Sequence, residues 1–310
     1  MNGKLVLGTR GSELALAQAH MVVEGLRARW ADLTVDIKII RTSGDQDDRK
    51  LDESARRAGR KGLFTAEIEQ ALVARRIDLA VHSAKDLPSE LGAATEIAAV
   101  LPRASADDML LSLMPRDLQS LPHNGIVATG SVRRKHQLRW KRPDLEIVDL
   151  RGNVPTRLRK LAKDPWHAII LAHAGLERLG LDTSNGRIRF EETEFFSRVL
   201  PREIFVPAGG QGAIAVQIRR DDDRARMLME PINDFDSRLC LRAEREFLRL
   251  LHGDCNQPVG VFAVVEGTMI KLRAQIFDLE ATTPREASVE GPSEDAESLA
   301  AELWSRINGK

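Results

Sequence analysis

Short polar turns, most of them carrying arginine, follow several of the apolar, strand-like runs of this chain. They occupy residues 9–12 (TRGS), 129–134 (TGSVRR) and 151–157 (RGNVPTR), and a fourth at residues 82–86 (HSAKD) adds a carboxylate beside a lysine. Gly, Ser and Thr let backbone N–H groups approach a ligand, and a following helix directs its positive end at it. Arginine adds a planar fork that suits carboxylates. Together the turns predict a cleft for a ligand with many negative groups.

Asp86 is the candidate catalytic carboxylate, because it stands in a turn of small residues directly after the apolar run 77–81. Taken alone, an aspartate beside Lys85 is more often a helix N-cap or half of a surface ion pair. Ser83 and the arginine-bearing turns are expected at the same sheet edge, and this favours function. Asp86 would then act as a general acid or base, or stabilise a developing cation.

Six arginines are candidate anion-binding groups. Each alone is as compatible with a solvated helix position as with function. Paired arginines at the start of a helix oppose the helix dipole, so we expect something anionic to compensate them. The six are Arg10, Arg133, Arg134, Arg151, Arg157 and Arg178.

The two cysteines differ in their surroundings. Cys240 fits a small buried hydrophobe in a helix, which is the usual state of a free cysteine. Cys255 lies in a polar loop, HGDCNQP, and is a candidate nucleophile or covalent anchor. The seven histidines show no metal-ligand spacing, and neither a P-loop nor a GxGxxG turn is present, so no metal, nucleotide or dinucleotide site is expected.

The composition restricts the class of protein. The chain has 46 basic and 46 acidic residues, which argues against a nucleic-acid binder that works by bulk positive charge. Tyr is absent and aromatic residues make up 4%, so base-stacking platforms are not expected. No apolar run approaches a membrane span, no targeting segment is recognisable, and two cysteines make no disulfide framework. We therefore expect a soluble cytoplasmic protein.

Strands and helices that alternate along the chain must position these residues. The pattern predicts strands at 5–7, 35–39 and 77–81, with helices from Ser12 and over 65–76. The charged stretch 46–61 is predicted to be a mobile loop. Such alternation indicates an α/β unit with a mostly parallel sheet, whose ligands bind beyond the carboxyl ends of the strands.

The same pattern starts again after residue 122, with predicted strands at 126–128, 145–150 and 168–172. Two similar α/β units with a cleft between them are the simplest interpretation, and residues 205–219 would cross between them. From about residue 221 a long helix, a hairpin (259–265 and 269–277) and a final helix near 293–307 predict a small α+β domain.

Taken in order, these motifs resemble those of the porphobilinogen deaminase (hydroxymethylbilane synthase) family along nearly the whole chain. Many ordered motifs at family-like spacing are a specific signal. The matching segments are residues 9–18, 42–45, 59–64, 82–88, 130–134, 150–154, 174–176 and 207–213, and the loop around Cys255.

The resemblance implies three domains. Two doubly wound, periplasmic-binding-protein-like lobes would comprise residues 1–103 with 204–220, which hold Asp86, and residues 104–203, which hold most arginines. A small α+β domain at 221–310 would hold Cys255. In this family the cofactor is a dipyrromethane in thioether linkage, so Cys255 would be its attachment point.

The resemblance also implies an activity and roles. Four molecules of porphobilinogen would be condensed, with loss of ammonia, into hydroxymethylbilane, by a monomer that needs no metal. Asp86 would stabilise cationic pyrrole species and handle protons, Phe64 would pack on a pyrrole, and the loop before Lys61 would be a lid. The residues implied to bind cofactor or substrate are Arg10, Ser12, Gln18, Lys61, Phe64, Ser83, Lys85, Thr129, Ser131, Arg133, Arg134, Arg151, Gly152, Arg157, Arg178 and Gln211.

Three features depart from the family pattern. Pro155 stands where the family often has glycine, residues 103–108 have lost most of a usual acidic segment, and residues 182–203 are longer than expected with no assigned role. The alternative function is a non-catalytic, two-lobed protein that binds a small anion and needs neither Asp86 nor Cys255. A nucleic-acid-binding module is disfavoured by the zero net charge.

Overall fold

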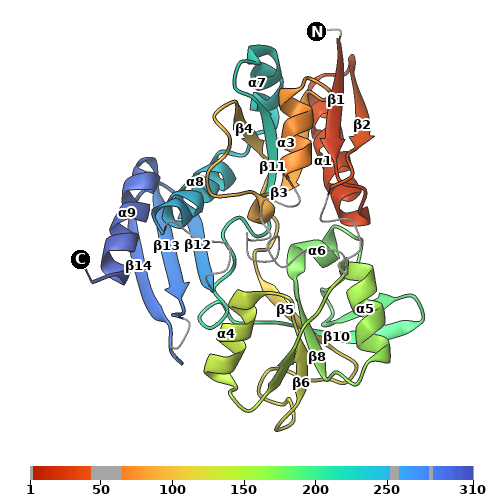
Figure 1. Ribbon diagram of the computed structural model, residues 1–310, viewed down its shortest axis with the longest axis vertical. Helices are drawn as coiled ribbons and strands as arrows, with labels where there is room; N and C mark the ends of the chain where they lie inside the picture. Colours follow the sequence, from red (N-terminus) through yellow and green to blue (C-terminus); the bar gives the residue numbers. More distant parts are fainter. Residues whose placement is uncertain (1–2, 43–64, 252–257, 279–281, 310) are drawn as a thin grey trace.

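The computed structural model describes residues 3–42, 65–251, 258–278 and 282–309 of the chain. The strands of these residues form three sheets of five, six and three strands. In Figure 1 the first sheet lies above the second, and the third sheet lies to the left of both. The predicted mobile loop lies outside the described residues.

The first sheet has the strand order β2-β1-β3-β11-β4. Its strands are β1 (Gly3–Thr9), β2 (Leu33–Ile39), β3 (Leu79–Ser83), β4 (Thr95–Val100) and β11 (Ile214–Arg219). Successive residues of a strand point to opposite faces. Leu79 of β3 therefore packs in one core with Val22 of α1 (Glu13–Arg29), and the next residue, Ala80, packs in another with Ile68 of α3 (Ala66–Val73). Together with α7 (Asp223–Met229), these helices cover both faces of the sheet.

The second sheet has the order β7-β6-β8-β5-β10-β9. Its strands are β5 (Asp108–Ser112), β6 (Ile126–Ala128), β7 (Glu146–Val148), β8 (Ala168–Ala172), β9 (Arg187–Phe190) and β10 (Thr193–Val199). Ile169 packs with Leu158 of α5 (Val154–Lys163), whereas Ile170 packs with Leu138 of α4 (Val132–Lys141). Helices again cover both faces, which makes this lobe similar to the first.

The long segment 182–203, which had no role in the sequence analysis, contains the hairpin of β9 and β10. β10 pairs antiparallel with β5, and β9 pairs antiparallel with β10 at the edge of the sheet. The segment therefore widens the second lobe.

Two crossing segments, residues 101–107 and 200–213, connect the two sheets. The Leu101 N–H donates to the Ile214 carbonyl at 3.1 Å, and the Ala104 N–H donates to the Gly212 carbonyl at 3.2 Å. Gly212 has φ +85°, and a Cβ on it would lie 2.4 Å from the Ala104 carbonyl oxygen. Only glycine lets the two segments run this close together.

The prediction of mostly parallel sheets is only partly right. β1, β2 and β3 are parallel, but β11 runs antiparallel to β3 and β4, and β5 runs antiparallel to β8. The physical reason is the edge of the sheet at which these strands begin. β11 and β5 each follow a crossing segment that reaches the carboxyl ends of the parallel strands. Both therefore start at that edge and run in the opposite direction to the parallel strands.

The third sheet consists of β12 (Val259–Glu266), β13 (Met269–Ile276) and β14 (Arg285–Pro292), covered by α8 (Phe235–Leu250) and α9 (Ala296–Ile307). The predicted hairpin and final helix are confirmed. β14 was missed, because its sequence, REASVEGP, alternates mainly polar and small residues and buries little apart from Val289 and Gly291. The expected fold class, two similar doubly wound α/β lobes and a small α+β unit, is confirmed.

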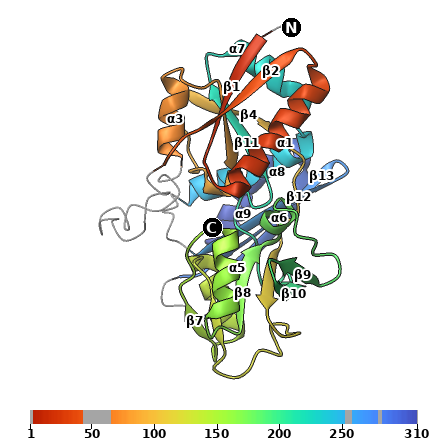
Figure 2. The ribbon, with the colours of Figure 1, turned by 90° about the vertical axis from the view of Figure 1, so that its right-hand side faces the viewer.

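The first and second lobes approach each other at α1 and α6 (His173–Glu177), which lie close together in both views (Figures 1 and 2). A Cβ built on Gly175 of α6 would contact the Leu14 side chain of α1 at 3.8 Å. Among the described residues, no helix is long and apolar enough to cross a membrane.

Candidate active site

Asp86 and Lys85 lie in a tight turn at the carboxyl end of β3. This turn is the 3-10 helix η3 (Ala84–Asp86), and the Ala84 N–H donates to the Ala213 carbonyl at 3.0 Å. The second crossing segment passes directly against it at Gly210, which has φ +77°. A Cβ on Gly210 would lie 2.8 Å from the Lys85 backbone nitrogen. The turn is therefore held in place by a segment that connects the lobes.

A cavity of about 70 Å³ lies at this edge of the first sheet. It is lined by five of the residues singled out in the sequence: Arg10, Ser12, Gln18, Ser83 and Asp86. The Ser12 hydroxyl caps α1 by accepting from the Ala15 N–H at 3.3 Å, and Gln18 Nε2 donates to Ser83 Oγ at 2.9 Å. The turn between β1 and α1 and the turn after β3 thus both line the cavity that contains the Asp86 carboxylate.

The Lys85 ammonium has an unusual environment. Burial lowers the pKa of Lys85 to about 8, Asp86 opposes this shift, and the charge of Arg134 adds to it. Asp108 and Arg157 also act electrostatically on the amine. Groups from the second lobe therefore influence a lysine of the first lobe, and they do so beside the candidate catalytic carboxylate.

The lowered pKa of Lys85 predicts a pH dependence of stability. Between pH 8 and 10.5 the unfolded chain binds a proton at Lys85 that the folded protein does not. The contribution of this group to the free energy of unfolding therefore becomes more favourable to the folded state as the pH rises. We expect Lys85→Met to be more stable than the wild type at pH 7, by about 1–3 kcal/mol, and to lose that advantage near pH 10. Urea denaturation of both proteins across this range checks it. A difference that does not change with pH would contradict the prediction.

The second lobe presents its polar turn at the start of α4. Ser131 is the N-cap of this helix, and its hydroxyl accepts from the Arg134 N–H at 3.4 Å. Thr129 is fully buried, and its hydroxyl accepts from the Ser131 N–H at 3.3 Å. Thr129 and Ser131 thus fix the backbone from which Arg133 and Arg134 extend.

Both arginines of this turn are bound to Asp108, a residue that the sequence analysis did not single out. Arg133 Nη1 lies 2.7 Å from Asp108 Oδ2, and Arg134 Nη2 lies 2.6 Å from Asp108 Oδ1. Asp108 is fully buried, yet the two guanidiniums outweigh burial and hold its pKa far below its usual range. Asp108 therefore supplies the kind of anionic compensation that the paired arginines led us to expect. One positive charge of the three-residue group is left uncompensated.

Gln211 lies with Asp108 and not in the cavity around Asp86. Its Nε2 donates to Asp108 Oδ1 at 2.8 Å and to the Ala106 carbonyl at 2.6 Å, and the residue is buried. It joins the two crossing segments to the arginine pair. Gln211, which was expected to bind the ligand, therefore has a structural role within the protein.

The turn before α5 carries Arg151, Gly152 and Arg157. Gly152 has φ +109°, and a Cβ on it would lie 2.7 Å from the Thr156 side chain, so glycine is required. Arg157 Nε donates to the Gly152 carbonyl at 2.7 Å. Arg151 forms a loose ion pair of 3.3 Å with Asp149. Both guanidiniums extend from a turn shaped by the glycine.

Arg178, at the end of α6, reaches from the second lobe to the crossing segment. Its Nη2 donates to the Gly212 carbonyl at 2.6 Å, while its Nε is buried with no hydrogen-bond partner among the described residues. Burial lowers the pKa of Arg178 to about 10. A buried donor without an acceptor is costly, and a ligand carboxylate would relieve that cost. Lys61, Phe64 and Cys255 lie outside the described residues.

Comparisons with known proteins agree over most of the chain. A family model described as "Porphobilinogen deaminase, dipyromethane cofactor binding domain" matches residues 5–227, and one described as "Porphobilinogen deaminase, C-terminal domain" matches residues 238–308. The porphobilinogen deaminase of Roseiflexus castenholzii is 43% identical over 98% of this chain and 96% of its own length. Those of Syntrophomonas wolfei (44%) and Nitrobacter hamburgensis (45%) each match 96% of this chain, and 93% and 90% of their own lengths. This chain belongs to the porphobilinogen deaminase family.

Proposed function

We propose that the protein is a transferase of tetrapyrrole biosynthesis that condenses four molecules of porphobilinogen into hydroxymethylbilane and releases ammonia. The observation that supports this most strongly is the carboxylate of Asp86 in a cavity shared with Arg10, Ser12 and Ser83, beside Lys85. The alternative, a protein that only binds a small anion, would gain nothing from a carboxylate at this point, because it would repel the ligand.

The described residues fit a dipyrromethane as the resident group. Its pyrroles carry acetate and propionate side chains, and the site offers the unsatisfied Nε of Arg178, the Lys85 ammonium and the excess charge of the Arg133–Arg134–Asp108 group. Arg151 and Arg157 add cations from the second lobe. When bound, the dipyrromethane would supply the nucleophilic pyrrole carbon that starts the chain. We propose Cys255 as its attachment point.

The residues of the first lobe would perform the proton chemistry. Asp86 would deliver a proton to the amino nitrogen of porphobilinogen, so that this nitrogen leaves as ammonia. The carboxylate would then stabilise the cationic methylene-pyrrolenine derived from the substrate, and later accept the proton lost from the pyrrole α-carbon that attacks it. Lys85, Arg10 and Ser12 would bind the acid side chains of the substrate, and so hold the substrate beside the Asp86 carboxylate.

The cations of the second lobe would hold the product as it grows. Each added ring brings an acetate and a propionate, so the number of carboxylates increases with each round. Arg134, Arg151 and Arg157 would bind these groups by charge-assisted hydrogen bonds. Ser131, Gly152 and Thr129 shape the turns that present them. We further propose that the protein acts as a monomer in the cytoplasm, and light scattering of the purified protein would test the oligomeric state.

The proposed function is tested by the denatured intact mass of the purified protein, before and after incubation with porphobilinogen. We expect a mass two pyrrole units above that of the chain, which grows in single-pyrrole steps with substrate. Cys255→Ser should fold and carry no covalent pyrrole. A modified Cys255→Ser protein would reject Cys255 as the anchor, and a wild-type mass that porphobilinogen never changes would reject the proposed function.

A further inference from the structure

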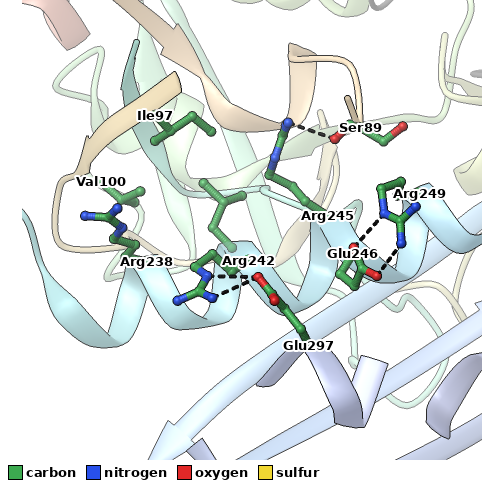
Figure 3. A pocket seen from close by; sticks show the side chains of 10 residues that line it. Ser89, Ile97, Val100, Arg238, Arg242, Arg245, Glu246, Arg249 and Glu297 are labelled. Atoms are coloured by element: carbon green, nitrogen blue, oxygen red, sulfur yellow. Dashed lines mark hydrogen bonds and ion pairs between the residues drawn. The ribbon is translucent and has the colours of Figure 1, made fainter. Parts of the chain in front are cut away.

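Four arginines form a row along α8, and none of them lines the cavity around Asp86. Arg238, Arg242, Arg245 and Arg249 follow one another at intervals of four, three and four residues, which places them on one face of the helix. They line a cavity of about 230 Å³, which we call the arginine cavity (Figure 3). Its other walls include Ser89, Ile97 and Val100 from the first lobe and Glu297 of α9.

Two of these arginines are neutralised by carboxylates in the cavity wall. Arg242 Nη2 lies 2.8 Å from Glu297 Oε1, and Arg249 Nη2 lies 2.7 Å from Glu246 Oε1. Figure 3 shows both pairs as dashed lines between neighbouring side chains. Four cations thus face two carboxylates in the wall, and Glu90, which does not line the cavity, lies 4.0 Å from Arg249 Nη1. The row of arginines therefore keeps at least one excess positive charge.

The other two arginines direct their hydrogen bonds to backbone carbonyls. Arg245 Nη2 donates to the Ser89 carbonyl at 2.9 Å, and Arg238 Nη1 makes a long contact of 3.4 Å with the Ala98 carbonyl. Arg245 is half-buried, and burial is the cause that lowers its pKa to about 10. A carbonyl oxygen offsets such a charge much less than a carboxylate does. Both guanidiniums therefore retain the capacity to bind an anion.

The spacing of Arg238 and Arg245 indicates the shape of the anion. Seven residues of an α-helix span roughly 10.5 Å, so the two arginines extend from points two turns apart. A single carboxylate can neutralise one of them. Two carboxylates joined by a short chain can reach both, and the apolar side chains of Ile97 and Val100 would contact the chain between them.

We propose that the arginine cavity binds a small linear dicarboxylate, with one carboxylate at Arg245 and the other at Arg238. Bound there, the ligand would connect the first lobe to α8, because Ser89 and Val100 belong to one side of the cavity and the arginines to the other. The cavity shares no lining residue with the one around Asp86, and the inference does not depend on the proposed function.

Isothermal titration of the full-length protein at constant ionic strength, with glutarate, butyrate and inorganic phosphate, tests the proposal. We expect glutarate to bind at least about tenfold more tightly than butyrate, since the second charge-assisted contact is worth that factor or more. Absence of glutarate binding at millimolar concentration would overturn the proposal. If butyrate or phosphate bound as tightly as glutarate, this would overturn the proposal that the cavity recognises both carboxylates of the ligand.

Variants locate the site. Arg245→Gln and Arg238→Gln should each weaken glutarate binding about tenfold or more. Arg27→Gln, which removes the same charge from an exposed position on α1, should leave it unchanged. Equal losses in all three variants would mean that glutarate responds only to the overall charge, and would overturn the proposed site.

Glu297→Gln is expected to increase the affinity for glutarate, a result that poor folding of the variant cannot produce. The substitution frees Arg242 from its carboxylate partner and removes one negative charge from the cavity wall. We expect glutarate to bind several-fold more tightly to this variant. Unchanged or weaker binding would contradict a dicarboxylate held by this row of arginines.

Discussion

Replacing Asp86 with asparagine is expected to lower kcat by about 10²–10⁴-fold, the usual contribution of a positioned general acid or base. The amide has nearly the same size as the carboxylate, so the cavity that Asp86 shares with Arg10 and Ser83 should keep its shape. The amide cannot transfer a proton or stabilise a cation by charge. The binding of porphobilinogen through its own carboxylates should change much less than the turnover, so KM should remain within a few-fold.

Steady-state rates of ammonia release, measured on protein whose intact mass confirms a loaded cofactor, would check the Asp86 prediction. Asp36→Asn is the matched control, because Asp36 is exposed on β2 and pairs with Lys4 at the surface. We expect this control to keep wild-type turnover. Asp86→Glu should restore part of the lost rate, since it returns the carboxylate at a changed position. Near-normal turnover of Asp86→Asn would reject the catalytic role.

Much of the fold and of the Asp86 cavity could be predicted from local sequence. Ser12 and Ser131 stand directly before helical patterns, and both are N-caps in the structure. Buried strands such as β3 can be recognised in the sequence as apolar runs, and a few small residues after such a run indicate the turn that ends the strand. Asp86 could be placed at the sheet edge for this reason.

Contacts between distant segments could not be predicted in this way. Asp108 is the first residue of an apolar strand, and nothing local shows that it faces Arg133 and Arg134, 25 and 26 residues further along. The family resemblance implied that Gln211 binds cofactor or substrate, yet its amide is directed at Asp108 because the two crossing segments run side by side. Such pairings depend on topology, which periodicity does not encode.

The arginine cavity illustrates the same limit. The row on α8 can be read from the sequence as a helix face rich in cations, and such a face is usually solvated. The structure places it against Ser89, Ile97 and Val100 of the first lobe, more than 130 residues away in the chain. Only this placement turns a charged helix face into the wall of a cavity.

Replacing Asp108 with asparagine is expected to lower the free energy of unfolding at pH 7 by about 3–5 kcal/mol, because it leaves two buried guanidiniums without their carboxylate. Arg133 and Arg134 are 5% and 6% exposed, so solvent cannot take over the role of Asp108. The neighbouring residue gives a matched control. Asp107 pairs with the half-exposed Arg202, and Asp107→Asn should cost no more than about 1 kcal/mol.

Urea denaturation of the wild type and both variants, from pH 7 down to pH 3, would test the Asp108 prediction and its cause. The folded-state pKa of Asp108 is depressed, so its contribution is complete above the unfolded value of about 3.9 and is lost only as the pH falls below it. The difference between wild type and Asp108→Asn should therefore stay constant from pH 7 to about 5, and narrow below pH 4. Equal losses for Asp107→Asn and Asp108→Asn would show that the buried charge group does not carry the expected stability.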